Sequence, residues 1–113
     1  MPVAETEDAL ERLRRLGAVD DERFARRTAD ALAARGLGDA AIMSRLVREG
    51  VDRTLAADAV DALAPEAERA AALTARKDPG ARTARWLSAR GFSVDSIAHA
   101  LPSVAQTDAA ELG

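Results

Sequence analysis

The chain has 113 residues and a formal net charge of −3, with a single histidine and no cysteine. This composition excludes disulfides, thiolate metal sites and a histidine-rich metal site, so we expect no metal and no cofactor. The acidic balance also argues against general affinity for nucleic acid. Because no apolar run is as long as a membrane span or a secretory signal, we expect a cytoplasmic protein without membrane contact.

Self-similarity with an offset of 41 residues organises the chain. When residues 29–60 are placed over residues 70–101 without gaps, Gly50 meets Gly91, and two leucine positions and one arginine position also coincide. Each copy contains three segments with helical spacing of apolar residues, separated by turns. Alanine makes up about a quarter of the chain and favours helices that pack closely but bury little area each. We therefore predict an all-α fold of tandem three-helix repeats that form an elongated, curved rod.

The predicted elements divide the chain into four segments. Residues 4–18 have the pattern of the third helix of a repeat, so the first repeat is predicted to be truncated to its last helix. Residues 19–64 and residues 65–103 are each predicted to form a complete three-helix repeat. Residues 104–113 are small and polar and are predicted to form a disordered tail.

Three predicted helix starts share one arrangement. An apolar residue precedes a good N-cap residue, and the position five residues after that apolar residue can close a hydrophobic staple. The acids of the first start are interpreted as first-turn helix residues rather than as a metal site, because a helix N-terminus favours negative charge. Two starts follow a glycine that fits a C-terminal cap with positive φ. The starts are Val19-Asp20, Val51-Asp52 and Phe92-Ser93, the acids are Asp20, Asp21 and Glu22, and the glycines are Gly50 and Gly91.

Two stretches carry a resemblance to a known family. The run Asp20-Asp21-Glu22-Arg23-Phe24-Ala25, followed by Gly36-Leu37-Gly38 and then by Leu46-Val47-Arg48-Glu49-Gly50-Val51, resembles the central repeat of RecX proteins. The run Trp86-Leu87-Ser88-Ala89-Arg90-Gly91-Phe92-Ser93, followed by Ile97, resembles the third repeat of that family. The resemblance covers residues 5–102, nearly the whole chain. The sequence departs from the family in one respect. RecX proteins usually carry three complete repeats, whereas here the first repeat is reduced to its last helix.

The resemblance implies a non-enzymatic regulator of the bacterial recombinase RecA. Members of the family are described as lodging in the helical groove of the RecA filament on single-stranded DNA, where they impede ATP hydrolysis and strand exchange. The resemblance therefore implies a role in DNA repair, recombination and the SOS response, with at most weak direct contact with DNA. We also expect a monomer. Two alternatives stay open: a helical protein that acts directly on DNA, and an adaptor for another client protein.

Basic residues near the C-terminal end form the main predicted partner-binding site. Between positions 76 and 92 there are five basic residues and one acid, Asp78, which is the strongest local charge imbalance in the chain. Arginine can bind a carboxylate or a phosphate through two parallel hydrogen bonds, so the cluster suits an acidic groove or phosphates on a partner. The alternative is that these basic side chains form an ordinary solvent-exposed face that binds no partner. The basic residues are Arg76, Lys77, Arg82, Arg85 and Arg90.

A second arginine group lies nearer the N-terminus. Arg23, Arg26 and Arg27 are predicted to contact the partner as well, although acids interleaved with them can compensate their charge. Trp86 is expected to be half-buried against its own repeat, with a partner anchor as the alternative.

One spacing could suggest catalysis. Asp95 and Ser96 lie four and three residues before His99, which on a helix brings the three side chains together. Val94 and Leu101, with Ile97, are expected to form the buried side of that helix. This phase turns the trio toward solvent, so we expect no enzymatic activity.

Overall fold

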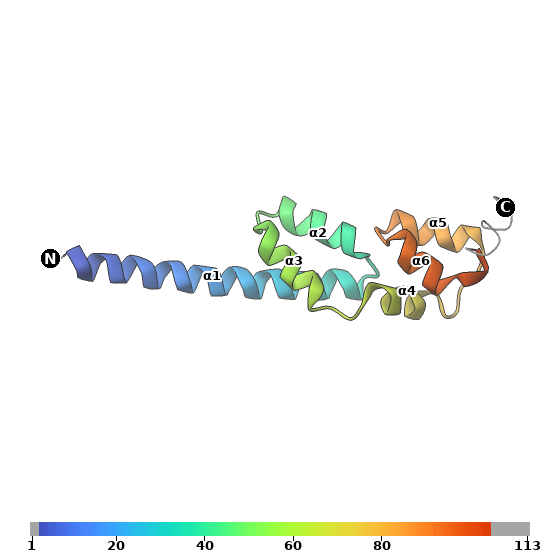
Figure 1. Cartoon of the computed structure of the whole chain (residues 1–113), viewed down its shortest axis with the longest axis horizontal. Coiled ribbons are helices and arrows are strands. Elements are labelled where there is room, and N and C mark those ends of the chain that lie inside the picture. Colours follow the sequence, from blue (N-terminus) through green and yellow to red (C-terminus); the bar gives the residue numbers. More distant parts are fainter. Residues whose placement is uncertain (1–2, 105–113) are drawn as a thin grey trace.

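The molecule is an elongated helical rod (Figure 1). In the computed structural model, which describes residues 3–104 with side chains from residue 7 onward, every regular element is a helix. The principal dimensions are 74 × 28 × 19 Å, so the predicted all-α, elongated architecture is confirmed. Within the described residues, no helix combines the length and the apolar character needed to cross a membrane.

Helix α1 (Val3–Ala34) runs unbroken for 32 residues. The helix start predicted at Asp20 is therefore wrong, and the predicted boundary between residues 18 and 19 is not a break in the helix. A side chain caps a helix by accepting hydrogen bonds from first-turn amides that have no carbonyl partner one turn earlier. In α1 the residues before Asp20 are already helical, so the carbonyls of residues 16–19 are available to those amides and no cap is needed. The acids Asp20, Asp21 and Glu22 lie in the interior of the helix rather than in its first turn.

Two three-helix units follow one another along the rod. In the first unit, the C-terminal part of α1 packs against α2 (Asp39–Arg48) and α3 (Arg53–Asp61). In the second unit, α4 (Glu66–Thr74) and α5 (Ala81–Ala89) both pack against α6 (Val94–Ala100). Figure 1 shows the two units side by side along the long axis of the molecule, with the N-terminal end of α1 extending beyond the first unit.

Each unit has its own small hydrophobic core. In the first unit, Ile42 and Leu46 of α2 are fully buried in a cluster that includes alanines of α1. In the second unit, Leu87 of α5 is fully buried in a cluster with Phe92 and Leu101. Because many core positions are alanine, each helix buries little apolar area and both units stay slender.

The turns between the second and third helices of the two units match their predicted form. Gly50 and Gly91 have φ angles of 93° and 92°, a region that glycine enters without a steric penalty. Immediately after them, Asp52 accepts a hydrogen bond from the amide of Thr54, and Ser93 caps α6 in the same way. The predicted glycine C-caps and the last two predicted N-caps are therefore confirmed.

The face of α1 that enters the core carries Ala25 and Ala29, and Phe24 is 44% exposed. Two burial predictions for α6 are wrong. Val94 is 82% exposed, whereas Ser96 is only 7% exposed. On the inner side of α6, the amide of Ser96 donates to Ser93 Oγ, and the hydroxyl of Ser96 accepts from the Ser93 hydroxyl.

The two ends of the chain differ in what the structure describes. At the N-terminal end, residues 3–24 of α1 project beyond the first unit, and we call this segment the arm. Every side chain from residue 7 to residue 24 is exposed. At the other end, residues 102–104 form a helical turn. The rest of the predicted disordered tail, residues 105–113, lies outside the described residues.

Candidate functional site

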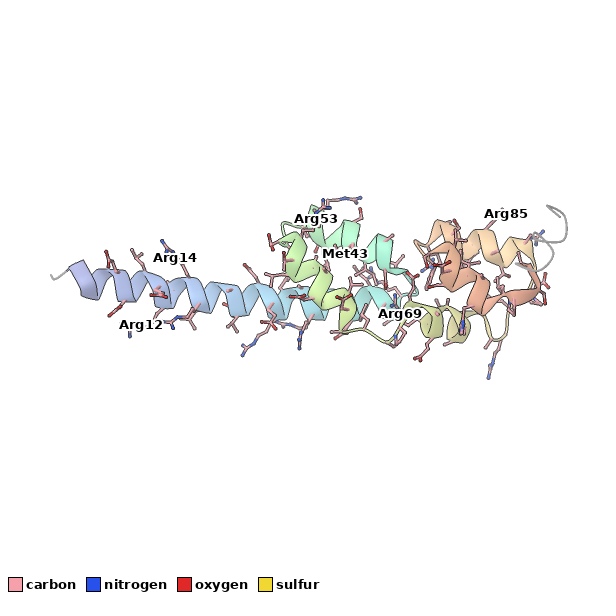
Figure 2. All side chains as sticks on the ribbon, in the orientation of Figure 1. Arg12, Arg14, Met43, Arg53, Arg69 and Arg85 are labelled. Atoms are coloured by element: carbon pink, nitrogen blue, oxygen red, sulfur yellow. The ribbon has the colours of Figure 1, made fainter. Side chains whose placement is uncertain are left out.

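Four of the five clustered basic residues lie on the surface of the second unit. Arg76 and Lys77 are exposed in the turn that follows α4, and Arg82 and Arg85 are exposed on α5. Arg82 and Arg85 are three residues apart and therefore share one face of the helix. Figure 2 places Arg85 near the far end of the rod. These side chains are accessible to a partner.

Arg85 borders a shallow apolar groove between α5 and α6. The groove has a volume of about 220 Å³, and most of its walls are apolar. Val94 and Ile97 of α6 contribute to it, with Leu101 at its edge. An apolar groove beside an arginine side chain suits a partner that offers a large apolar residue next to an acidic one.

Trp86 lies between two basic side chains. The ammonium nitrogen of Lys77 is 4.2 Å from the centroid of the Trp86 ring, and the guanidinium carbon of Arg90 is 5.0 Å from it. Both distances suit cation–π contacts. Trp86 is half-buried and packs against the core of its own unit, as predicted. Its ring therefore contacts one exposed basic side chain, Lys77, and one that turns toward the first unit, Arg90.

Arg90 holds the two units together instead of facing solvent. Its Nε donates a hydrogen bond of 2.8 Å to the carbonyl of Gly36, and its Nη2 donates to the carbonyl of Arg35. These carbonyls follow the C-terminus of α1, where unpaired acceptors and a partial negative charge favour a cation. The guanidinium predicted to bind a partner is thus engaged within the chain, in a contact we call the unit junction (residues 35–41, 64–69 and 90–93).

Glu66 bridges two helix N-termini in the unit junction. Its Oε2 accepts a 2.7 Å hydrogen bond from the amide of Asp39 at the start of α2. Its Oε1 accepts from the amide and the hydroxyl of Ser93, at 3.0 and 2.8 Å, at the start of α6. Partial burial acts to raise the pKa of the Glu66 carboxyl, but hydrogen bonding with Ser96, Asp39 and Ser93 together lowers the pKa below its ordinary value. The ionised carboxylate therefore stabilises the contact between the units.

Arg69 completes this polar network. Its Nη1 donates to Asp39 Oδ1 at 2.8 Å and to the carbonyl of Ala64 at 3.0 Å, and its Nη2 donates to the carbonyl of Leu37 at 3.1 Å. The side chain is only 13% exposed, and Figure 2 places it where the two units meet. A mostly buried guanidinium with three acceptors fixes the position of α4 against the turn that precedes α2.

Backbones approach directly at the centre of the unit junction. The amides of Gly38 and Ala40 donate to the carbonyls of Arg90 and Gly91, at 2.8 and 3.3 Å. A Cβ atom on Gly38 would lie 2.4 Å from the backbone of Gly91, which is far inside van der Waals contact. The junction therefore requires glycine at this point.

The sequence contains a signal for the unit junction, although the repeat pattern alone did not reveal it. Glu66, Arg69 and Arg90 occupy repeat positions where the first unit has uncharged residues or the opposite charge. Their equivalents 41 residues earlier are Ala25, Thr28 and Glu49. Arg82 and Arg85 break the repeat in the same way, replacing Ala41 and Ser44, but lie in solvent, so such a break does not by itself identify the junction.

The second predicted arginine group lies on the arm and next to it. Arg23, Arg26 and Arg27 are all exposed, and Arg26 lies 3.7 Å from Glu22 in an exposed i,i+4 pair. Arg27 and Phe24 line a shallow groove between α1 and α2. Arg35, Arg45 and Glu49 also border this groove, and Arg45 pairs with Glu49 at 2.7 Å. Arginine thus outnumbers acid around the groove.

The remaining candidates do not form a site. Ser96 is bonded to Ser93 and is buried, whereas Asp95 and His99 are exposed, so the three side chains do not line one surface. Among the described side chains, no three imidazole or carboxylate groups gather as a metal ion would require.

Comparisons with known proteins give no match. No protein-family model matches the chain, and searches of curated proteins and of solved structures found no match either.

Proposed function

We propose that this chain is a RecX-like regulatory protein that binds the RecA filament on single-stranded DNA and inhibits its ATPase and recombinase activity. The proposal rests on the resemblance of both repeats to RecX proteins and on the elongated shape of two joined units. A cytoplasmic, non-catalytic role in DNA repair and recombination belongs to the same proposal. The observation that carries it is the surface of the second unit, where exposed Arg85 borders an apolar groove and exposed Arg82 lies one helical turn away.

The unit junction explains how such a rod could act by binding alone. A regulator that spans neighbouring subunits of a filament must resist bending, and three charged side chains with close backbone contacts join the two units here. Arg82 and Arg85 are then held at a constant distance from the first unit. By occupying the groove of the filament, the rod would oppose the motions that RecA needs for ATP turnover.

The test is RecA ATPase activity on single-stranded DNA with increasing amounts of the protein. We expect the protein to inhibit this activity. The double charge reversal Arg82→Glu/Arg85→Glu should raise the protein concentration needed for the same inhibition by about tenfold or more. The matched control is Arg48→Glu/Arg53→Glu, which reverses two exposed arginines on the first unit and is expected to leave inhibition unchanged. No inhibition at several-fold excess over RecA would refute the proposal.

Binding to DNA without RecA separates the proposal from the DNA-binding alternative. A protein that neutralises many phosphates loses affinity steeply as salt rises. We expect weak binding to naked single-stranded DNA and tight binding to the RecA filament. Strong, steeply salt-dependent affinity for naked DNA would favour direct action on nucleic acid, and a lack of binding to both would favour an adaptor with another client.

A further inference from the structure

The arm carries an apolar stripe that nothing in the described chain covers. Leu10 is 48% exposed and Leu13 is 64% exposed. Further along the same helix, Phe24 is 44% exposed. Positions 10, 13, 17, 20, 24 and 27 alternate in steps of three and four, which is the spacing of a seam between two helices. Leu10, Leu13 and Phe24 occupy three of these positions, with Gly17 and Asp20 between Leu13 and Phe24 and with Arg27 after Phe24.

A helix in this state needs a partner. Most helical stability in proteins comes from packing of an apolar face rather than from intrinsic helix propensity. The arm has alternating charges instead of an internal core: its side chains from residue 7 to residue 24 are all exposed. Its stability as a helix therefore depends on something that covers the stripe.

The order of the charges on α1 indicates what that partner is. Four blocks of charge alternate along the helix, first acidic, then basic, then acidic, then basic. When the helix is reversed about Gly17, each acidic block lies beside a basic block. The blocks are Glu7, Asp8 and Glu11; Arg12, Arg14 and Arg15; Asp20, Asp21 and Glu22; and Arg23, Arg26 and Arg27.

The same reversal aligns Leu10 with Phe24, whereas Leu13 falls beside Asp21. Leu10 lies seven residues before Gly17 and Phe24 lies seven residues after it, so the two meet at the same height in an antiparallel pair. The acidic start of one arm then lies beside Arg27, at the mouth of the arginine-rich groove between α1 and α2. A parallel pair would instead place each charge block beside its own copy and would be repelled.

We propose that a second copy of this chain covers the arm, so that two arms pack as an antiparallel helix pair that crosses near Gly17. This inference departs from the monomer expected from the sequence and does not depend on RecA. Gly17 suits the crossing point because a Cβ there would meet no atom within 4 Å of its own chain, which leaves room for a close approach of the second helix. The proposed partner-binding face around Arg82 and Arg85 lies at the opposite end of the rod and stays free.

The first test is the mass of the full chain in solution, measured by sedimentation across a wide range of concentration. We expect a reversible monomer–dimer equilibrium. Leu10→Ser should raise the dissociation constant by about tenfold or more, because it removes the apolar contact with Phe24 of the second copy. The matched control is Val19→Ser on the same helix, since Val19 is also exposed, at 44%, but falls outside the seam spacing. A chain that stays monomeric at the highest concentration, or a dimer that both substitutions weaken equally, would overturn the proposal.

The second test uses charge reversal and needs no substitution in the core. In the antiparallel pair, Arg14 lies close to the height of Asp20 and Asp21 of the second copy. Arg14→Glu alone and Asp21→Arg alone should each weaken the dimer, because like charges then meet at two symmetric contacts. An equimolar mixture of the two variants should regain the affinity of the original chain, because opposite charges meet again at both contacts. A mixture no tighter than either variant alone would contradict the antiparallel arrangement.

The third test reads the direction of the helices. The chain has no cysteine, so single introduced cysteines report one contact each. Gly17→Cys should form an intermolecular disulfide under mild oxidation, whereas Leu10→Cys should not, because position 10 lies beside position 24 of the second copy. Leu10→Cys mixed with Phe24→Cys should cross-link. Efficient cross-linking of Leu10→Cys with itself would indicate a parallel pair and overturn the proposal.

Discussion

Gly91→Ala tests the contact between the two units, with Gly50→Ala as its matched control. The two glycines occupy equivalent positions in the repeat and have nearly the same φ, 92° and 93°. A Cβ on Gly50 would meet no atom within 4 Å, whereas a Cβ on Gly91 would lie 2.6 Å from the Cβ of Ala41 and 2.7 Å from its amide nitrogen. The backbone cost is therefore shared by both variants, and only Gly91→Ala adds a clash across the unit junction.

The expected magnitudes follow from these distances. Placing alanine at a positive φ costs about 1–2 kcal/mol, so both variants should lose that much in free energy of unfolding. Gly91→Ala should lose about 1–3 kcal/mol more, the usual cost of forcing extra volume into a packed contact. For a domain of this size, each kcal/mol corresponds to about 4–8 °C in melting temperature.

Urea unfolding of both variants measures this difference, and hydrogen exchange shows where it arises. The amides of Gly38 and Ala40 donate across the unit junction to Arg90 and Gly91. Their exchange should accelerate in Gly91→Ala and stay near the original rate in Gly50→Ala. Equal losses of stability in the two variants, with unchanged exchange at Gly38, would refute the close packing of the units.

Three further substitutions test single contacts. Glu66→Gln should lower the free energy of unfolding by about 1 kcal/mol at neutral pH, measured by urea titration. Because the pKa of Glu66 is lowered on folding, its stabilisation is present above the ordinary carboxyl pKa and is lost as the pH falls through the folded pKa. The difference in free energy of unfolding between the original protein and Glu66→Gln should therefore disappear in acid. A difference that stays constant with pH would contradict this. Arg90→Lys should lose about 1 kcal/mol in thermal unfolding through the lost guanidinium fork, whereas exposed Arg85→Lys should lose nothing. Asp52→Ala should lower the free energy of unfolding by about 1 kcal/mol because it removes the N-cap of α3, whereas Asp20→Ala removes no cap and should not lower it. Equal losses in the two variants would indicate that a helix starts at residue 20.

Local signals in the sequence determined the parts of the fold that depend on neighbouring residues. The positive φ angles at Gly50 and Gly91 and the caps at Asp52 and Ser93 need only residues within one helical turn, so they follow from the pattern of residue types. The same kind of signal failed at Asp20. A capping residue does not by itself end the preceding helix, and residues 16–19 contain no proline to interrupt it.

Tertiary structure decided how the repeats meet and which arginines remain free. Glu66 bonds to residues 27 positions away in both directions, and Arg90 bonds to carbonyls more than 50 positions away. Charge clustering could not distinguish Arg90 from Arg85, because both lie in the same basic run. The packing of one unit on the other brings Arg90 to the C-terminus of α1 and leaves Arg85 in solvent. The carbonyls at a helix end can bind a cation only after the folded chain has brought that cation next to them.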